Sequence, residues 1–328
     1  MRRLILALTV ILTSTLVAAD PDPILIEARG KLPTLVNPNC SHCKDEAARR
    51  KDDLRANDRV LCWTRGKYEG GAIPFRFYLH AYPVISDTYG VFVHDVNAGF
   101  ARGFEPSLEF VFHGWRNGIM VIEHKDGTLF SALSGIAFAG KRKGEQLKPV
   151  ATITSDWGWW NKHYPDTVAY HMFERYVPKE APLKQSAAGK KSMGKADPRL
   201  PEQERVLGLR VGKETKAYRV KELSEAVVLA DKLGDQPCVL LYDADTKTAA
   251  AYSTIATPPK PGPKARVLTL TATKKDGFTD KETGSTWDIA GRAVAGPLAG
   301  WTLGWLDGIE VKWYAWAAEF PRTRVHGK

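Results

Sequence analysis

Apolar and polar residues alternate with a period of two along much of the chain, and this pattern predicts β-strands with one buried face. The stretches LEFVFHG (108–114) and VLTLTAT (267–273) are examples. In HKDGTLF (124–130), Asp126 and Gly127 stand where a tight hairpin turn would join two strands. The stretch SDWGWWNKHYPDT (155–167) instead predicts a short helix that ends before Pro165. The pattern as a whole predicts an α+β fold that is mainly β.

The chain also contains an internal repeat. Residues 124–171 align without a gap on residues 280–327, with 12 identities in 48 positions, where average composition gives about three. The identical pairs include Gly135/Gly291, Gly140/Gly296, Gly144/Gly300, Trp157/Trp313, Trp160/Trp316, Pro165/Pro321 and Thr167/Thr323. Further upstream, Ala81-Tyr82 pairs with Ala217-Tyr218, and VFVHD (91–95) pairs with VLLYD (239–243). Because both tryptophans recur while their neighbours change, we predict that they are core residues and not a sugar-stacking platform.

The start of the chain, MRRLILALTVILTSTLVAAD, is typical of a secretory signal peptide, with two arginines, a short apolar run and a small-residue cleavage site. The run is too short to span a bilayer. The predicted organisation is a signal peptide (1–19), an N-terminal segment with a Cys-x-x-Cys helix (20–58), copy one (59–177), a flexible Lys-rich linker (178–204) and copy two (205–328). The mature protein is predicted to be extracytoplasmic, either periplasmic or secreted, with no membrane span.

The formal net charge is +10. Such a charge suits nucleic-acid binding, but an exported protein meets anionic polymers, lipids and other proteins first, and several lysines lie in the linker. We therefore expect no nucleic-acid partner. The candidate partners are an extracytoplasmic protein thiol and an anionic cell-surface polymer.

Candidate chemistry is concentrated at NPNCSHCKDE (37–46). A helix starting here would favour the Cys40 thiolate as a nucleophile, with His42 beside it and Cys43 as the resolving partner. Alternatively, Cys40, Cys43 and Cys62 could bind zinc, with His80 or His42 as the fourth ligand. A third interpretation is a structural Cys40–Cys43 disulfide, with Cys62 and Cys238 free or paired. The sequence leaves all three open.

Seven of the eight histidines precede the linker, so copy one is the better candidate for an active copy. The run FHGWRNGIMVIEHKDG (112–127) makes His113 a candidate catalytic group. In the simpler interpretation, His94 and His113 are half-exposed residues at strand ends. The alternative function is a non-enzymatic extracytoplasmic binding or structural module, for which Trp63, Trp115 and Trp159 are the aromatic residues to inspect.

Several motifs resemble the bacterial domain-of-unknown-function family 3179. In copy one they are AYPV (81–84), SDTYG (86–90), TLFSALSGIAFAG (128–140) and WGWWNKHYPDT (157–167); in copy two they are AYRV (217–220), GSTWDIAGRAVAGPLAG (284–300) and WYAWAAEFPRT (313–323). Many members of that family resemble one another in a Cys-Pro-Leu-Cys motif, but neither VFVHDVNAGF (91–100) nor VLLYDADTKT (239–248) contains a cysteine. Because the family has no settled activity, the resemblance implies a fold more than a mechanism.

Overall fold

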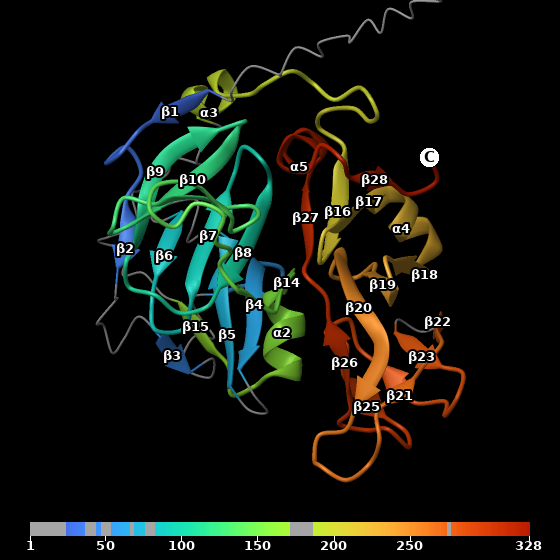
Figure 1. Ribbon diagram of the computed structural model, residues 1–328. Helices are drawn as coiled ribbons and strands as arrows, with labels where there is room; N and C mark the ends of the chain where they lie inside the picture. Colours follow the sequence, from blue (N-terminus) through green and yellow to red (C-terminus); the bar gives the residue numbers. More distant parts are fainter. Residues whose placement is uncertain are drawn as a thin grey trace, which may run out of the picture.

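The computed structural model describes residues 24–36, 44–46, 54–65, 69–75, 83–170, 186–273 and 277–328. In these ranges the strands form six sheets, accompanied by short helices (Figure 1). The prediction of an α+β fold that is mainly β is therefore confirmed. The predicted signal peptide lies outside the described residues.

Three sheets are built mainly from the N-terminal half, residues 59–177, and each takes one border strand from the segment before it. The first contains β1 (Leu25–Glu27), β9 (Phe110–Arg116), β10 (Ile119–His124), β11 (Leu129–Ser131) and β12 (Ala137–Ala139). The second contains β13 (Pro149–Val150), β8 (Phe100–Phe104), β7 (Val91–Asp95), β6 (Val84–Ser86) and β2 (Thr34–Val36). The third contains β14 (Thr152–Asp156), β4 (Arg59–Arg65), β5 (Glu69–Pro74), β15 (Val168–Tyr170) and β3 (Lys44–Glu46).

The C-terminal half, residues 205–328, forms the other three sheets. One contains β27 (Gly308–Lys312), β16 (Arg205–Val211), β17 (Glu214–Arg219) and β28 (Arg324–Val325). The next contains β18 (Val228–Leu233), β19 (Gln236–Asp243), β20 (Thr248–Thr257) and β21 (Arg266–Val267), with β26 (Thr302–Trp305) also paired with β20. The last contains β22 (Leu270–Ala272), β23 (Phe278–Asp280), β24 (Thr286–Trp287) and β25 (Ala293–Ala295).

The two halves pair their strands in the same order. β14 lies antiparallel to β4 and β15 parallel to β5, as β27 lies antiparallel to β16 and β28 parallel to β17. Details also match: Gly140 and Gly296 have φ of +92° and +91°, in the left-handed region that favours glycine. These matches explain physically why the aligned residues are the same in both halves.

The strand pairing corrects one part of the sequence alignment. Ala72 on β5 is paired with Ala169 on β15, as Ala217 on β17 is paired with Val325 on β28. The strand pairing therefore makes Ala217 correspond to Ala72, whereas the sequence alignment pairs Ala217 with Ala81, which lies outside the described residues. A dipeptide match carries no information on strand register, whereas the backbone pairing sets it.

Helices α2 (Trp157–His163) and α5 (Trp313–Glu319) occupy matching places after β14 and β27, and α2 confirms the predicted short helix. Trp160 Nε1 donates to Thr167 Oγ1 at 2.9 Å, and Trp316 Nε1 donates to Thr323 Oγ1 at the same distance. α4 (Val220–Ala226) connects β17 to β18. Trp157 and Trp160 are buried, which confirms their prediction as core residues.

The second half of the predicted linker is ordered and packed, which differs from the flexible spacer that its composition predicts. It contains α3 (Ala187–Lys191), capped by the Ser186 side chain, and it buries Leu200. The amide of Asn97 accepts from Ser186 N at 2.7 Å and donates to Ser186 O at 3.2 Å. Small and polar residues therefore dock here through backbone hydrogen bonds, a mode that an apolar pattern does not reveal.

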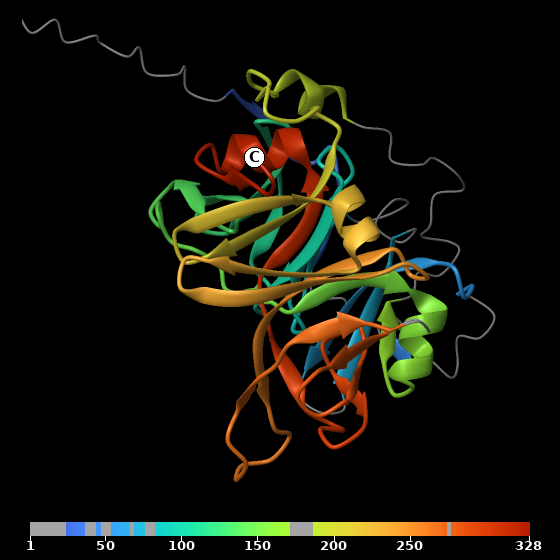
Figure 2. The ribbon, with the colours of Figure 1, turned by 90° about the vertical axis from the view of Figure 1, so that its right-hand side faces the viewer.

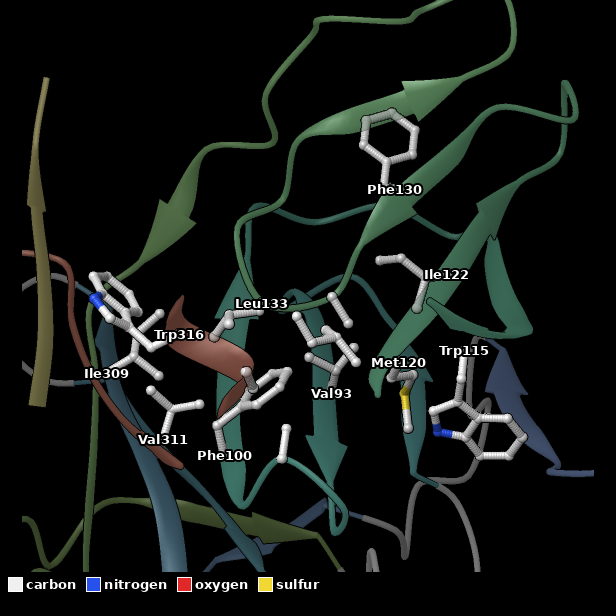
Figure 3. Packing of buried hydrophobic residues seen from close by; sticks show 14 of the residues in the cluster. Val93, Phe100, Trp115, Met120, Ile122, Phe130, Leu133, Ile309, Val311 and Trp316 are labelled. Carbon is white, nitrogen blue, oxygen red and sulfur yellow. The ribbon is translucent and has the colours of Figure 1, made fainter. Parts of the chain in front are cut away.

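The hydrophobic cores cross between the halves. One cluster joins residues of the N-terminal half, including Phe100 and Leu133, to Ile309, Val311 and Trp316 from the C-terminal half (Figure 3). A second cluster joins Trp157 and Trp160 to strands β19, β20 and β24–β26. Each half therefore buries its helix and outer strand against the other half, and the two halves lie side by side along this contact (Figures 1 and 2).

Candidate functional site

His113 lies in a β-bulge of β9. Val121 is opposite Gly114 and Ile122 is opposite Phe112, so His113 has no partner residue on β10. Bulges re-aim side chains and are frequent near functional sites. The His113 side chain is 1% exposed, and its Nδ1 lies 2.9 Å from Glu123 Oε2 on β10. The expectation that His113 is half-exposed is therefore wrong, because the N-terminal segment covers it.

Arg29, just after β1, holds the carboxylate of Glu123 in place. Its Nε and Nη2 donate to the two Glu123 oxygens at 2.7 and 2.8 Å. Burial opposes ionisation of Glu123, but the hydrogen bonds from Arg29 and His113 outweigh it and lower the Glu123 pKa. A carboxylate that orients an imidazole in this way is typical of a general base.

His113 Nε2 is buried and has no hydrogen-bond partner in the described part of the chain. It lies 3.6 Å from Oε1 of Glu27, a largely exposed carboxylate on β1. An anion at this place would pair with a protonated imidazole, but it offers no hydroxyl or thiol for the imidazole to activate. His113 is thus oriented as a general base would be, but a carboxylate faces it in place of a group that it could deprotonate.

His94 and Asp95 end strand β7 and are both buried, which again differs from the half-exposed His94 expected from sequence. Asp95 accepts three backbone hydrogen bonds, from Asn97 at 2.9 Å, Ala98 at 3.0 Å and Met120 at 2.7 Å. Burial nevertheless raises the pKa of Asp95 to about 6, and burial lowers the pKa of His94 to about 4. Burial thus shifts the pKa values of these two adjacent residues in opposite directions.

A small cavity of about 40 Å³ lies beside these two residues. Leu32 of the N-terminal segment, Trp115 and Met120 of the N-terminal half, and Ser186 of the linker contribute to its wall. This is room for one or two water molecules. The cavity is therefore a joint between three parts of the chain and is too small for an organic substrate.

Cys62 and Cys238 are free cysteines in separate apolar clusters. Burial raises the pKa of the Cys62 thiol well above its usual value, and burial raises that of Cys238 to about 11. Metal ligation and disulfide exchange both require the thiolate. The surroundings of these two cysteines therefore favour inert thiols.

The predicted site residues are divided between described and undescribed parts. Cys40, His42, Cys43 and His80 lie outside the described residues. Cys62 on β4 and His113 on β9 belong to different sheets and are not brought together. Across the described ranges, no group of three His, Cys, Asp or Glu side chains could hold a metal ion.

The residues directly after Cys43 differ from the predicted helix. Lys44–Glu46 form β3, which pairs antiparallel with β15. The charged composition favours a helix, but pairing at the edge of a sheet overrides a weak local preference. Lys44–Glu46 therefore do not form the first turn of the predicted helix.

The aromatic residues considered for a binding platform are mostly buried. Trp63 is 2% and Trp115 is 4% exposed, whereas Trp159 is half-buried and stacks on His163 with ring centroids 4.3 Å apart. Of the three, Trp159 alone keeps part of its surface accessible.

Sequence reasoning missed Arg29, Glu123 and Asp95. Glu123 is adjacent to His124 in a strand that alternates, which places it on the face opposite to Ile122. Asp95 has a signal in the repeat, because Asp243 stands at the aligned position and also accepts hydrogen bonds in the turn that follows. Arg29 comes from a separate segment and has no local signal.

Comparison with known proteins gave one match. The family model described as "Protein of unknown function (DUF3179)" matches residues 82–323. No curated protein and no solved structure matches the chain. In the described residues, no helix has the length and apolar character needed to cross a bilayer.

Proposed function

The chain belongs to the family "Protein of unknown function (DUF3179)", and we propose that it is an exported member, built from two copies of one domain, that exchanges disulfides at Cys40 and Cys43. The copies correspond to residues 59–177 and 205–328. The matched strand pairings, glycine torsions and Trp–Thr hydrogen bonds of the two halves support the duplication.

The observation that carries the proposal is that both ends of the cysteine-bearing stretch are tied to the N-terminal copy. Val36, before it, is paired with Ser86, and Lys44, after it, is paired with Tyr170. The hydroxyl of Tyr170 donates to the carboxylate of Asp87, the residue after Ser86. The described residues on either side of Cys40 and Cys43 thus both pair with strands of the N-terminal copy.

The surroundings of Cys62 favour disulfide exchange over a zinc site. A zinc site of the expected composition needs a Cys62 thiolate, and burial among apolar side chains makes that thiolate unfavourable. Exchange needs Cys40 and Cys43 alone. His42, the histidine between the two cysteines, is a group in the sequence that would favour the thiolate.

In the proposed reaction, the Cys40 thiolate attacks one sulfur of a disulfide in an extracytoplasmic protein. A mixed disulfide forms, and the other sulfur of the partner leaves as a thiolate that takes up a proton. The Cys43 thiolate then attacks the Cys40 sulfur, releases the partner as a dithiol and leaves the Cys40–Cys43 disulfide. Two electrons pass from the cysteine pair to the partner.

Trapping of the mixed disulfide tests the proposal. Cys43→Ser should accumulate an adduct with a disulfide-bonded model protein through Cys40, because the resolving thiol is absent, whereas Cys40→Ser should form none. Cys62→Ala is the matched control and should behave as the wild type. Intact mass should also show an oxidised form two hydrogens lighter, mapped to Cys40–Cys43 and opened by mild reductant.

Two outcomes would contradict this function. A zinc-sized adduct that is lost on denaturation would indicate a metal site at these cysteines. A Cys40–Cys43 bond that resists mild reductant would indicate a structural disulfide, and with it a binding or structural module.

A further inference from the structure

The C-terminal half contains a hairpin that the N-terminal half lacks. In the N-terminal half, residues 105–109 connect β8 directly to β9. In the C-terminal half, β20 continues to Thr257, turns back as β21 at Arg266 and reaches β22 at Leu270. The turn between β20 and β21 extends away from the sheets (Figure 2). The otherwise matched halves differ here by a protruding element.

The charged side chains of the hairpin are all positive. Residues 248–272 contain no Asp or Glu, whereas Lys260, Lys264 and Arg266 are all exposed. Arg266 lies 5.9 Å from the Trp301 ring centroid, and none of the three cations forms an ion pair with a described carboxylate. The corresponding connection in the N-terminal half carries the opposite charge, from Glu105 and Glu109. The insertion therefore adds unneutralised positive charge.

The same hairpin exposes an apolar pair on the face opposite to Arg266, whose cross-strand partner is the buried Ala256. Ile255 and Val267 are paired across β20 and β21 and are 39% and 68% exposed. Four prolines occupy the tip, in TPPKPGPK (257–264), and restrict its backbone. A stiff projection with apolar and basic side chains together is typical of a segment that inserts into the interfacial region of an anionic bilayer.

We propose that the β20–β21 hairpin docks the protein onto an anionic lipid surface, with Lys260 and Lys264 against the headgroups and the face of Ile255 and Val267 at the acyl boundary. A soluble anionic polymer would satisfy the cations but would leave the apolar pair in water. The paired apolar side chains therefore favour a lipid surface. This proposal is independent of the cysteine chemistry and would stand if that chemistry failed.

Vesicle binding of the full mature chain tests the proposal, with phosphatidylglycerol vesicles as the anionic probe and phosphatidylcholine vesicles as the neutral one. The wild type should bind the anionic vesicles and not the neutral ones, and binding should weaken with salt. Replacing Lys260 and Lys264 with serine should lower the partition coefficient roughly thirtyfold. Ile255→Ser with Val267→Ser should lower it roughly tenfold.

The matched control replaces Lys141 and Lys143 with serine, two exposed cations in a turn of the N-terminal half, and should bind as the wild type. Equal binding to both vesicle types would overturn the proposal, as would a variant with serine at positions 260 and 264 that still binds normally. Full vesicle binding by the Ile255/Val267 variant, together with equally tight binding of a soluble polyanion by the wild type, would also overturn it in favour of a polymer. All variants lie on the surface, and their unfolding temperatures check that they fold.

Discussion

At the scale of single residues, burial shifts the pKa values of His94 and Asp95 in opposite directions. Burial disfavours the charged form of each, which lowers the pKa of the imidazole to about 4 and raises that of the carboxyl to about 6. In the unfolded chain the usual values are 6.5 and 3.8. Between about pH 4 and about pH 6, folding releases a proton from His94 and takes one up at Asp95. The two effects on stability therefore nearly cancel.

The pH dependence of two variants separates these contributions. As pH falls from 6.5 to 4, His94 becomes protonated in the unfolded chain but not in the folded chain. The free energy of unfolding of the wild type therefore falls by up to about 3 kcal/mol, a loss that His94→Gln does not share. As pH falls from 6 to 3.8, Asp95 becomes protonated in the folded chain before it does in the unfolded chain. The free energy of unfolding of the wild type therefore rises by up to about 3 kcal/mol, a gain that Asp95→Asn lacks.

The measurement is the free energy of unfolding in urea for each variant minus that of the wild type, across pH 3.5 to 7.5. As the pH falls, the free energy of unfolding of His94→Gln should rise relative to that of the wild type. That of Asp95→Asn should fall relative to that of the wild type. Two flat differences would show that neither residue titrates differently on folding. Asp95→Asn should also be less stable at pH 7.5, because an amide cannot accept all three backbone hydrogen bonds.

At the scale of elements, the two tryptophan helices offer a matched experiment. Trp160 donates to Thr167 and Trp316 donates to Thr323, all within buried surroundings. Thr167→Val and Thr323→Val should each cost about 1–3 kcal/mol, because each leaves a buried indole N–H without its acceptor. Urea unfolding measures both costs. Thr→Ser at either position keeps the hydroxyl and is the control; similar losses in the serine variants would show that the methyl group matters and the hydrogen bond does not.

These elements also show what the sequence can predict. Alternation, the Asp126-Gly127 turn and the segment that ends before Pro165 predict the β-rich fold, one hairpin and α2, because each depends on residues close in sequence. The strand β3, the register of Ala72 and the burial of His113 depend on pairing or covering by distant segments. Local patterns carry no information on such contacts, so most of the candidate site could not be predicted.

At the scale of the whole molecule, the crossed cores make each half depend on the other. Ile309, Val311 and Trp316 belong to the cluster of the N-terminal half, and Trp157 and Trp160 belong to that of the C-terminal half. The buried guanidinium of Arg102 on β8 donates to both oxygens of Asp307, before β27, at 3.0 and 3.1 Å. Two halves with separate cores would unfold separately, whereas these should unfold together.

Asp307→Ala tests this dependence because it leaves the Arg102 cation, 3% exposed, without its carboxylate. We expect a loss of about 3–5 kcal/mol, shared by both halves. Hydrogen exchange should show the protection of slowly exchanging amides falling by the same amount in β7 of one half and β19 of the other. Arg205→Ala breaks a surface pair with Glu310 in the same region and should cost less than about 1 kcal/mol. Loss of protection confined to one half of the Asp307→Ala variant would show that the halves fold independently and that the shared cores add contact without cooperativity.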